Sequence, residues 1–567
     1  MKAGSIMKND EEKRKKSIRY LTNNAQKGIL SSIIQLSKYY EEGRYVPQDI
    51  KKSTELLMDL VELSSDNKFR LDELTLIDYK GFERLNFRLS NSNLTIFIGD
   101  NGAGKTTILE SIVKSLSWLM YNIVSENNNN GHKIDDSDIR KNSTNDVSSI
   151  FTSFSLNKKN SFKLELNQSK KFSLNKVDGY YVEIKWLASI YQTINNLSPT
   201  YGLPLIAYYP VERSINITKG EIDRKVASIA GKSLWNKIDG YDGSITSNAS
   251  KSSFEVFIGW FKRFDDIKNE DTSSIRELKQ KIQLIEDEKL KIINDLSSIR
   301  LDDNTIKAIF EKIKERKDEE LDLLKKELEY EEKTNPKKAS VISILECVTK
   351  AIYKIMPEFN NLRIERHPDL DMLIDKGNVS LSVTQLSQGE RSLLALVGDI
   401  ARRLVMLNPE KKNPLTGQGI VLIDEIDLHL HPRWQQTIVS KLKKTFPNIQ
   451  FILTTHSPTV ISTIDRRDLY ILKDGLIYDS PIGTNGAQSS RVLKHVYDVN
   501  DRAPDNIISK WLIRYKSMVY KDQWSSPRAI AIRKKLDAAL GLDEPELNAL
   551  DVYIESREWE LEIEKDK

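Results

Sequence analysis

A glycine-rich loop at residues 99–106 carries the clearest chemical signal in the chain. It reads Gly-Asp-Asn-Gly-Ala-Gly-Lys-Thr, follows the apolar run 94–98 and precedes a helical pattern that begins near Ile108. Glycines let backbone N–H groups point at phosphate oxygens, the lysine adds positive charge, and the threonine hydroxyl is a Mg²⁺ ligand. The loop therefore predicts a nucleotide phosphate site. Its predicted binding residues are Gly99, Asp100, Asn101, Gly102, Ala103, Gly104, Lys105, Thr106 and Thr107.

Two carboxylates at the end of a second apolar run supply complementary chemistry. Residues 420–423 predict a buried strand that ends in Asp424 and Glu425. We expect Asp424 to hold Mg²⁺ together with Thr106. The adjacent Glu425 is the predicted base that takes a proton from the attacking water.

A histidine and a helix start complete the candidate groups. A third apolar run, 451–455, ends in His456, which we expect to hydrogen-bond a γ-phosphate. Upstream, Ser387 and Gly389 stand at the start of an amphipathic helix that extends to Leu404. Because the first N–H groups of a helix lack intrahelical partners, this start is a predicted anion site.

The elements that must position these residues follow from hydrophobic patterning. Short runs at 71–79 and 85–89 predict a β-hairpin before the loop, and Leu205–Tyr209 predicts a further buried strand. The polar tract 125–149 predicts a loop. Helices alternate with the apolar runs, so the predicted class is α/β. The C-terminal segments 506–520 and 526–540 are predicted helices.

The N-terminal segment pairs two helical stretches around a Gly43–Pro47 turn. The sequence pattern of this segment resembles a single tetratricopeptide-like repeat of the SEL-one-like kind. An ordinary helical hairpin is the alternative. Since one such unit cannot bury its own apolar face, we expect it to dock on a neighbouring element.

Residues 275–328 change to a seven-residue apolar repeat, which predicts coiled-coil-like helices. Lys289 is the one exception in the first arm, and the segment 302–304 breaks the pattern. An antiparallel hairpin with arms on the order of 40 Å follows from the rise per residue. It either braces the domain or binds a partner. The repeat positions are Ile275, Leu278, Ile282, Ile285, Ile292, Leu296, Ile299, Ile306, Phe310, Ile313, Leu321, Leu324 and Leu328.

Composition limits the function classes. The chain has 567 residues, and 86 Lys+Arg against 82 Asp+Glu give a net charge of +4, which excludes a simple basic nucleic-acid coat. The single Cys347 excludes an internal disulfide framework. No apolar run approaches the roughly 20 residues of a membrane helix, so we expect a soluble, cytoplasmic protein without membrane contact.

We expect five regions along the chain. They are a helical N-terminal region (1–65), a first lobe with the glycine-rich loop (66–245), a helical insertion (246–345), a second lobe (346–485) and a C-terminal helical region (486–567).

Two other motif matches are rejected. Asn175–Asp178 matches the guanine-specificity tetrapeptide of GTPases, but Asp178-Gly179 predicts a hairpin turn between strands at 172–174 and 180–184. The three histidines His429, His431 and His456 invite a metal interpretation, which we also reject.

The order of these motifs resembles the head of an ABC-type ATPase, with Walker A, signature, Walker B, D-loop and switch histidine. The resemblance implies ATP and Mg²⁺ as cofactors and a homodimer in which the signature of one chain closes over the nucleotide of the other. It also implies that Asp427 is the D-loop residue and that His429 and His431 belong to a His-Leu-His-Pro segment. The expected Q-loop position, 210–214, lacks a glutamine, so that assignment stays open.

Segments 383–400, 419–434 and 446–458 look most like the ATPase subunit (PtuA-like) of Septu anti-phage defence systems, in the retron-associated form. This resemblance implies a separate HNH nuclease as partner, and a reverse transcriptase with its RNA–DNA hybrid. The alternative is a DNA repair or recombination ATPase of the structural-maintenance-of-chromosomes-like class, which would show DNA-stimulated turnover with a steep salt dependence.

Overall fold

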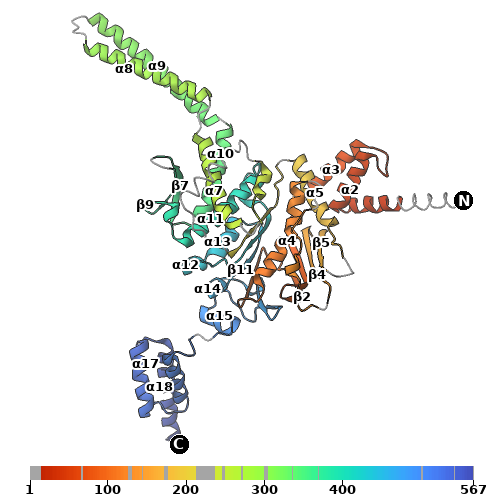
Figure 1. The fold of residues 1–567 in the computed structure, drawn as a ribbon. Helices are drawn as coiled ribbons and strands as arrows, with labels where there is room; N and C mark the ends of the chain where they lie inside the picture. Colours follow the sequence, from red (N-terminus) through yellow and green to blue (C-terminus); the bar gives the residue numbers. More distant parts are fainter. Residues whose placement is uncertain are drawn as a thin grey trace, which may run out of the picture. The chain divides into compact units, whose positions relative to one another are not determined.

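Five apolar segments form the parallel part of the central sheet in this computed structural model (Figure 1). The sheet has the order β13-β12-β3-β11-β10-β6, with only β13 antiparallel. All residues of β3, β6, β10 and β11 are buried, as expected for parallel strands covered on both faces. The strands are β3 (Leu94–Gly99), β6 (Leu205–Tyr209), β10 (Gly419–Ile423), β11 (Ile449–Thr454), β12 (Leu469–Lys473) and β13 (Leu476–Asp479).

The structure describes residues 15–64, 68–125, 130–143, 145–171, 177–198, 200–211, 236–245, 249–269, 273–298, 304–334, 336–367, 370–499, 502–541 and 543–565. The proposed Q-loop residues 212–214, the predicted strand 172–174 and residues 299–303, which include the predicted repeat position Ile299, lie outside them.

An antiparallel sheet of order β2-β1-β4-β5 accompanies the central sheet. The predicted hairpin is confirmed, with β2 beginning three residues earlier than expected. The loop prediction for 125–149 is wrong at its end, where β4 begins. In β4 and β5 buried residues alternate with less buried ones, and the less buried face is mainly polar. The strands are β1 (Arg70–Tyr79), β2 (Phe82–Arg88), β4 (Val147–Asn157) and β5 (Asn160–Ser169).

The predicted strand at 180–184 is also wrong. Only Tyr180 forms a bridge, to Glu165, and α5 (Val182–Leu197) begins two residues later. The helical spacing of Ile184, Leu187, Tyr191 and Ile194 puts their side chains on one buried face, and this 3.6-residue period outweighs the short apolar start.

Helices α4 (Lys105–Val124) and α11 (Gln388–Leu407) lie at the two candidate anion sites. Helix α4 packs against β3, β6 and β11, and α11 packs against β6, α7 (Ala249–Asn269) and α10 (Pro336–Ile355). A small sheet of β7 (Phe359–Glu365), β8 (Asp371–Lys376) and β9 (Val379–Ser382) precedes α11. The short helices α12 (Pro432–Gln435), α13 (Ile438–Thr445) and α14 (Pro458–Ile461) follow β10 and β11.

The N-terminal helix pair docks on its neighbour, as predicted. Helices α2 (Leu30–Glu42) and α3 (Ile50–Ser64) pack against each other and against α5. The backbone N–H of Leu30 donates to Asn160 Oδ1 at 2.8 Å, and the Tyr201 hydroxyl donates to the carbonyl of Ser64 at 2.8 Å.

The helical hairpin is confirmed in α8 (Ser273–Ser298) and α9 (Asn304–Thr334), which lie side by side (Figure 1). Leu278, Ile282, Ile285 and Leu321 are buried between the helices. Lys289, the exception in the repeat, forms an ion pair with Asp318 across the hairpin.

The chain divides into two compact units, residues 1–480 and 481–567. The second contains α15 (Ser489–Val496), α16 (Ile507–Val519), α17 (Pro527–Leu540) and α18 (Pro545–Lys565). Helices α16 and α17 were predicted and begin at N-caps Asn506 and Ser526; α18 was not predicted. Their shared core consists of Leu512, Tyr515, Val519, Ala529, Ile532, Leu536, Leu547 and Leu550.

Candidate functional site

The glycine-rich loop joins β3 to α4 and needs its glycines for conformation and for space. Gly102 and Gly104 have φ of +82° and +101°, in the left-handed region that favours glycine. A Cβ on Gly104 would lie 2.5 Å from the ring of Phe82, and one on Gly99 would lie 2.3 Å from the carbonyl oxygen of Leu472. The loop therefore leads directly into the start of α4, and helix starts of this kind favour phosphate groups.

Lys105 is buried at the first position of α4. Its Nζ donates to the carbonyl oxygens of Gly99 and Asp100, at 2.9 Å each. Burial lowers the pKa of Lys105, while the charges of Asp424 and Glu425 oppose that shift. The ammonium group is thus hydrogen-bonded to the backbone of the loop in which it is predicted to bind phosphate.

Asp424 lies at the end of β10, and hydroxyl groups engage both of its carboxylate oxygens. The Thr106 hydroxyl donates to Oδ2 at 2.6 Å, and the Thr454 hydroxyl donates to Oδ1. The three residues meet because β10 and β3 both pair with β11 in parallel register. Hydroxyl and carboxylate oxygens are the hard ligands that Mg²⁺ prefers, so Thr106 and Asp424 fit a magnesium ion.

Glu425 and Asp427 follow the same strand and are also tied to the end of β11. The backbone N–H of Glu425 donates to Thr454 Oγ1 at 2.7 Å, and Glu425 has a φ of +48°. The Thr455 hydroxyl donates to Asp427 Oδ1 at 2.5 Å. His456 comes directly after these threonines, so the structure brings the predicted base, the D-loop residue and the histidine to one end of the sheet.

Sequence reasoning missed the roles of Thr454 and Thr455. Their position, directly before His456 at the end of a buried strand, is the signal that identifies them, because hydroxyls there face the neighbouring strand ends.

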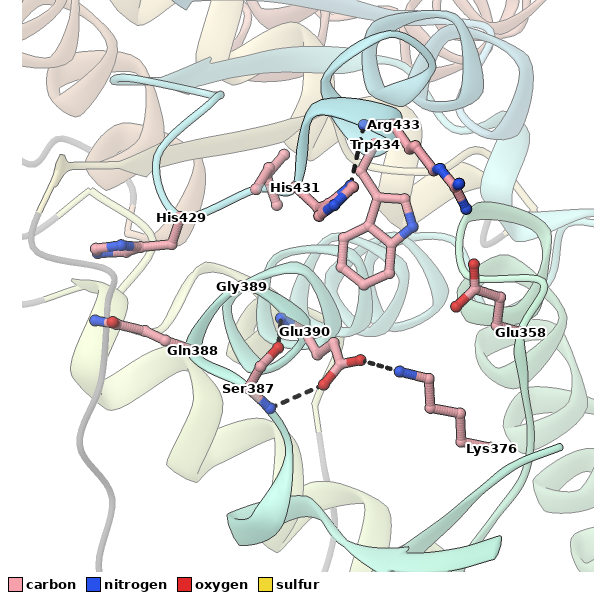
Figure 2. Close-up of a pocket in the computed structure, with 11 residues that line it drawn as sticks. Glu358, Lys376, Ser387, Gln388, Gly389, Glu390, His429, His431, Arg433 and Trp434 are labelled. Carbon is pink, nitrogen blue, oxygen red and sulfur yellow. Dashed lines mark hydrogen bonds and ion pairs between the residues drawn. The ribbon is translucent and has the colours of Figure 1, made fainter. Parts of the chain in front are cut away.

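Ser387 and Gly389 line a separate cavity of about 680 Å³ at the start of α11 (Figure 2). We call this cavity the signature pocket. The segment 429–431 passes so close that a Cβ on Gly389 would lie 2.2 Å from the carbonyl oxygen of His429. The full lining is Glu358, Lys376, Ser387, Gln388, Gly389, Glu390, His429, Leu430, His431, Arg433 and Trp434.

His431 has a local structural contact that sequence reasoning did not assign. It is the N-cap of α12, and its Nδ1 accepts the backbone N–H of Arg433 at 3.3 Å.

A buried charged cluster on α11 was also missed. Asp399 Oδ1 accepts from Arg402 at 2.7 Å, and its Oδ2 accepts from Arg403 at 2.7 Å and from the Tyr209 hydroxyl at 2.9 Å. Burial alone would raise the pKa of Asp399, but the two guanidinium groups hold it below its ordinary value. The carbonyl of Tyr209 accepts the backbone N–H of Asp424 at 2.9 Å, so the cluster connects α11 to the strand end that carries Asp424.

These features define the class: a phosphate loop between β3 and α4, an acidic pair after β10, a histidine after β11 and a glycine-containing helix start at α11 are the parts of an ABC-type ATPase head. The predicted α/β class is confirmed by the mainly parallel sheet between helices. Among the described helices, none is long and apolar enough to cross a membrane.

Comparisons with known proteins agree with this class. Residues 94–462 match the family described as "AAA domain, putative AbiEii toxin, Type IV TA system". The chain is 36% identical over 552 residues to the "Retron Ec83 probable ATPase" of Escherichia coli, covering 96% of this chain and 98% of that one. It is 36% identical over 526 residues to the "Retron Vc95 probable ATPase" of Vibrio cholerae serotype O1 biovar El Tor, covering 90% and 95%.

The chain belongs to this AAA-domain family, in the group of retron ATPases, and is an ATPase. A shorter stretch of 73 residues is 52% identical to the Septu protein PtuA of Bacillus mycoides, covering 13% of this chain and 10% of that one. The predicted resemblance to Septu and retron ATPases is therefore confirmed. A crystal structure of an Smc head domain from Pyrococcus furiosus, bound to the C-terminal domain of ScpA, aligns with a TM-score of 0.37 at 16% identity, covering 76% and 100%.

Proposed function

We propose that this chain is the ATPase subunit of an anti-phage defence complex, in which two copies form composite ATP sites and regulate a separate HNH nuclease. The similarity to the retron ATPases over nearly the whole of both chains carries the proposal. By the same kinship, a reverse transcriptase and its RNA–DNA hybrid are proposed partners. We keep 1–65, 66–245, 246–345, 346–485 and 486–567 as the proposed domain boundaries, with 1–65 and 486–567 as candidate partner contacts.

The two-copy arrangement is supported by the finding that the Walker residues and the signature residues belong to separate parts of the chain's surface. The Walker centre, made of the loop 99–106, Asp424 and Glu425, lies at one end of the central sheet. The signature pocket is lined by different residues. Ser387 and Gly389 of the second copy would complete the binding site around a nucleotide held by the Walker centre of the first copy.

The chemistry assigns a task to each side chain. The loop and Lys105 bind the phosphates, and Thr106 and Asp424 would hold Mg²⁺, which would neutralise charge on the phosphates during the transfer. Glu425 accepts a proton from water while the oxygen of that water attacks the γ-phosphorus. The bond between the γ-phosphorus and the ADP oxygen breaks in the same reaction. His456, which follows β11, is the proposed hydrogen-bond donor to the γ-phosphate. In this scheme the nuclease responds to closure of the two copies on nucleotide.

Native co-purification tests the proposal. Tagged Glu425→Gln protein is purified from its own host with ATP and Mg²⁺, and bound proteins and nucleic acids are identified. We expect an HNH nuclease, a reverse transcriptase and an RNA–DNA hybrid. Lys105→Ala, which removes the phosphate-binding ammonium, is the matched control and should lose nucleotide-dependent partners. Recovery of repair proteins with genomic DNA ends, or of the chain alone, would overturn the defence assignment.

Turnover measurements test the assignment of the base. Glu425→Gln should retain ATP binding and lose roughly 100-fold or more in turnover, within the usual range for general bases. Unchanged turnover would remove Glu425 from this role.

A further inference from the structure

A fixed carboxylate occupies the anion-binding start of α11. Glu390 Oε2 accepts the backbone N–H of Ser387 at 2.8 Å, while Ser387 Oγ accepts the backbone N–H of Glu390 at 3.3 Å. This reciprocal capping box satisfies two free donors of the helix start. It also puts negative charge beside the groups that are expected to meet a phosphate, which by itself would repel one.

Lys376 engages the other oxygen of the same carboxylate. At the end of β8, its Nζ donates to Glu390 Oε1 at 2.6 Å and lies 5.3 Å from the centroid of the Phe359 ring (Figure 2 shows the pair). Burial would raise the pKa of Glu390, but Lys376 and Ser387 lower it; Glu390 in turn raises the pKa of Lys376. Both groups are therefore charged at neutral pH.

The charges that line the signature pocket cancel. Lys376 and Arg433 are positive, Glu358 and Glu390 are negative, and the remaining titratable side chains are the two histidines. Removing Lys376 would leave one net negative charge, placed where an anion must enter. Arg433 lies on the α12 side of the pocket, whereas Glu390 and Lys376 form their ion pair at the start of α11.

We propose that Lys376 is a positioning residue that neutralises Glu390 and thereby lets the Ser387–Gly389 helix start receive the terminal phosphate of the nucleotide bound by a second copy. The inference rests on the two-copy arrangement proposed above. It assigns Lys376 an electrostatic task at the composite site, through Glu390, in addition to its place in the small sheet.

Nucleotide-driven association of the full-length chain tests this role. In the Glu425→Gln background with ATP and Mg²⁺, sedimentation gives the protein concentration for half-maximal dimer formation. Lys376→Ala should raise that concentration roughly tenfold, the effect of about one lost charge interaction. Binding of ATP to the isolated monomer should stay unchanged, because the Walker centre does not include Lys376. Lys376→Arg is the charge-preserving control.

The decisive variant is Lys376→Ala combined with Glu390→Gln. Glutamine keeps the capping box, and the double change restores a net charge of zero, so association should return to within about threefold of the background. Thermal unfolding of each variant checks that the fold is kept. A double variant as weak as Lys376→Ala, or an unaffected Lys376→Ala, would overturn the inference. If the Glu425→Gln background itself fails to associate with ATP, the two-copy arrangement is what fails.

Discussion

The Walker centre and the signature pocket each contain a fixed carboxylate, and they differ in what holds it. Asp424 is held by the hydroxyls of Thr106 and Thr454, which donate hydrogen bonds without cancelling its charge. Glu390 is held by the ammonium group of Lys376. The first arrangement keeps negative charge for a cation, and the second removes it so that helix N–H groups can receive an anion.

A third carboxylate extends the comparison. Asp399 is fully buried and is held by two guanidinium groups and the phenol of Tyr209. Its charge is paired within the core, one hydrogen-bonded residue away from Asp424, so it acts on stability and on the placement of α11. The groups that hold each carboxylate thus differ with its proposed role: metal ligand for Asp424, neutralised helix cap for Glu390 and buried structural charge for Asp399.

The largest expected effect is on stability. Asp399→Ala leaves the guanidinium groups of Arg402 and Arg403 buried without their carboxylate, and we expect a loss of roughly 3–5 kcal/mol in the free energy of unfolding. Tyr209→Phe removes one hydrogen bond to the same carboxylate and should cost about 1 kcal/mol. Urea titration of the full chain measures both. Equal, small losses for the two variants would show that the cluster is not a coupled charge group.

The next effect is on magnesium. Asp424→Asn keeps a side chain of the same shape but removes the charge, and we expect turnover to fall roughly 100-fold or more because metal stabilisation amounts to several kcal/mol. Turnover measured against Mg²⁺ concentration reports it. Thr106→Ser, which keeps the hydroxyl, is the control. An Asn variant with wild-type Mg²⁺ dependence would contradict the assignment.

A smaller effect should follow from the hydroxyl of Thr454. Thr454→Val is nearly isosteric, yet it removes the donor to Asp424 and the acceptor for the Glu425 N–H, so we expect a loss of about 1–3 kcal/mol in stability. Thermal unfolding and turnover measure the change, and turnover should fall roughly tenfold. Thr454→Ser should behave as wild type, and failure of this rescue would place the effect in packing.

The smallest effect concerns pH at the signature pocket. The pKa of Glu390 is lower in the folded chain than in the unfolded one, so its contribution to stability is complete above the unfolded value of about 4.3 and is lost as pH falls through the folded value. The stability difference between wild type and Glu390→Gln, up to about 1 kcal/mol for the lost ion pair with Lys376, should stay constant from pH 8 to 6 and shrink below about pH 4. A difference that vanishes at pH 6 would indicate a raised pKa instead.

Local patterns identified much of the candidate site. The sequence predicts the glycine-rich loop, the acids after β10 and the histidine after β11, because each group follows an apolar strand in the chain. The hairpin of α8 and α9 could also be predicted from a local pattern. A seven-residue apolar repeat forms a stripe along one helix that packs against a second helix with the same repeat. Strands β4 and β5 and helix α18 were missed, because β4 and β5 are polar on one face and α18 carries exposed apolar residues such as Val552 and Trp559 opposite its core.

The sequence by itself determined the phosphate loop, the acidic pair, the caps of α11, α16 and α17, and the heptad hairpin, because each depends on residues a few positions apart. Only the tertiary structure decided which partner holds each acid: Thr454 for Asp424, Lys376 for Glu390 and Tyr209 for Asp399. Those pairs join different strands and helices, so the physical reason is that strand order and helix packing, and not local spacing, bring them within hydrogen-bond distance.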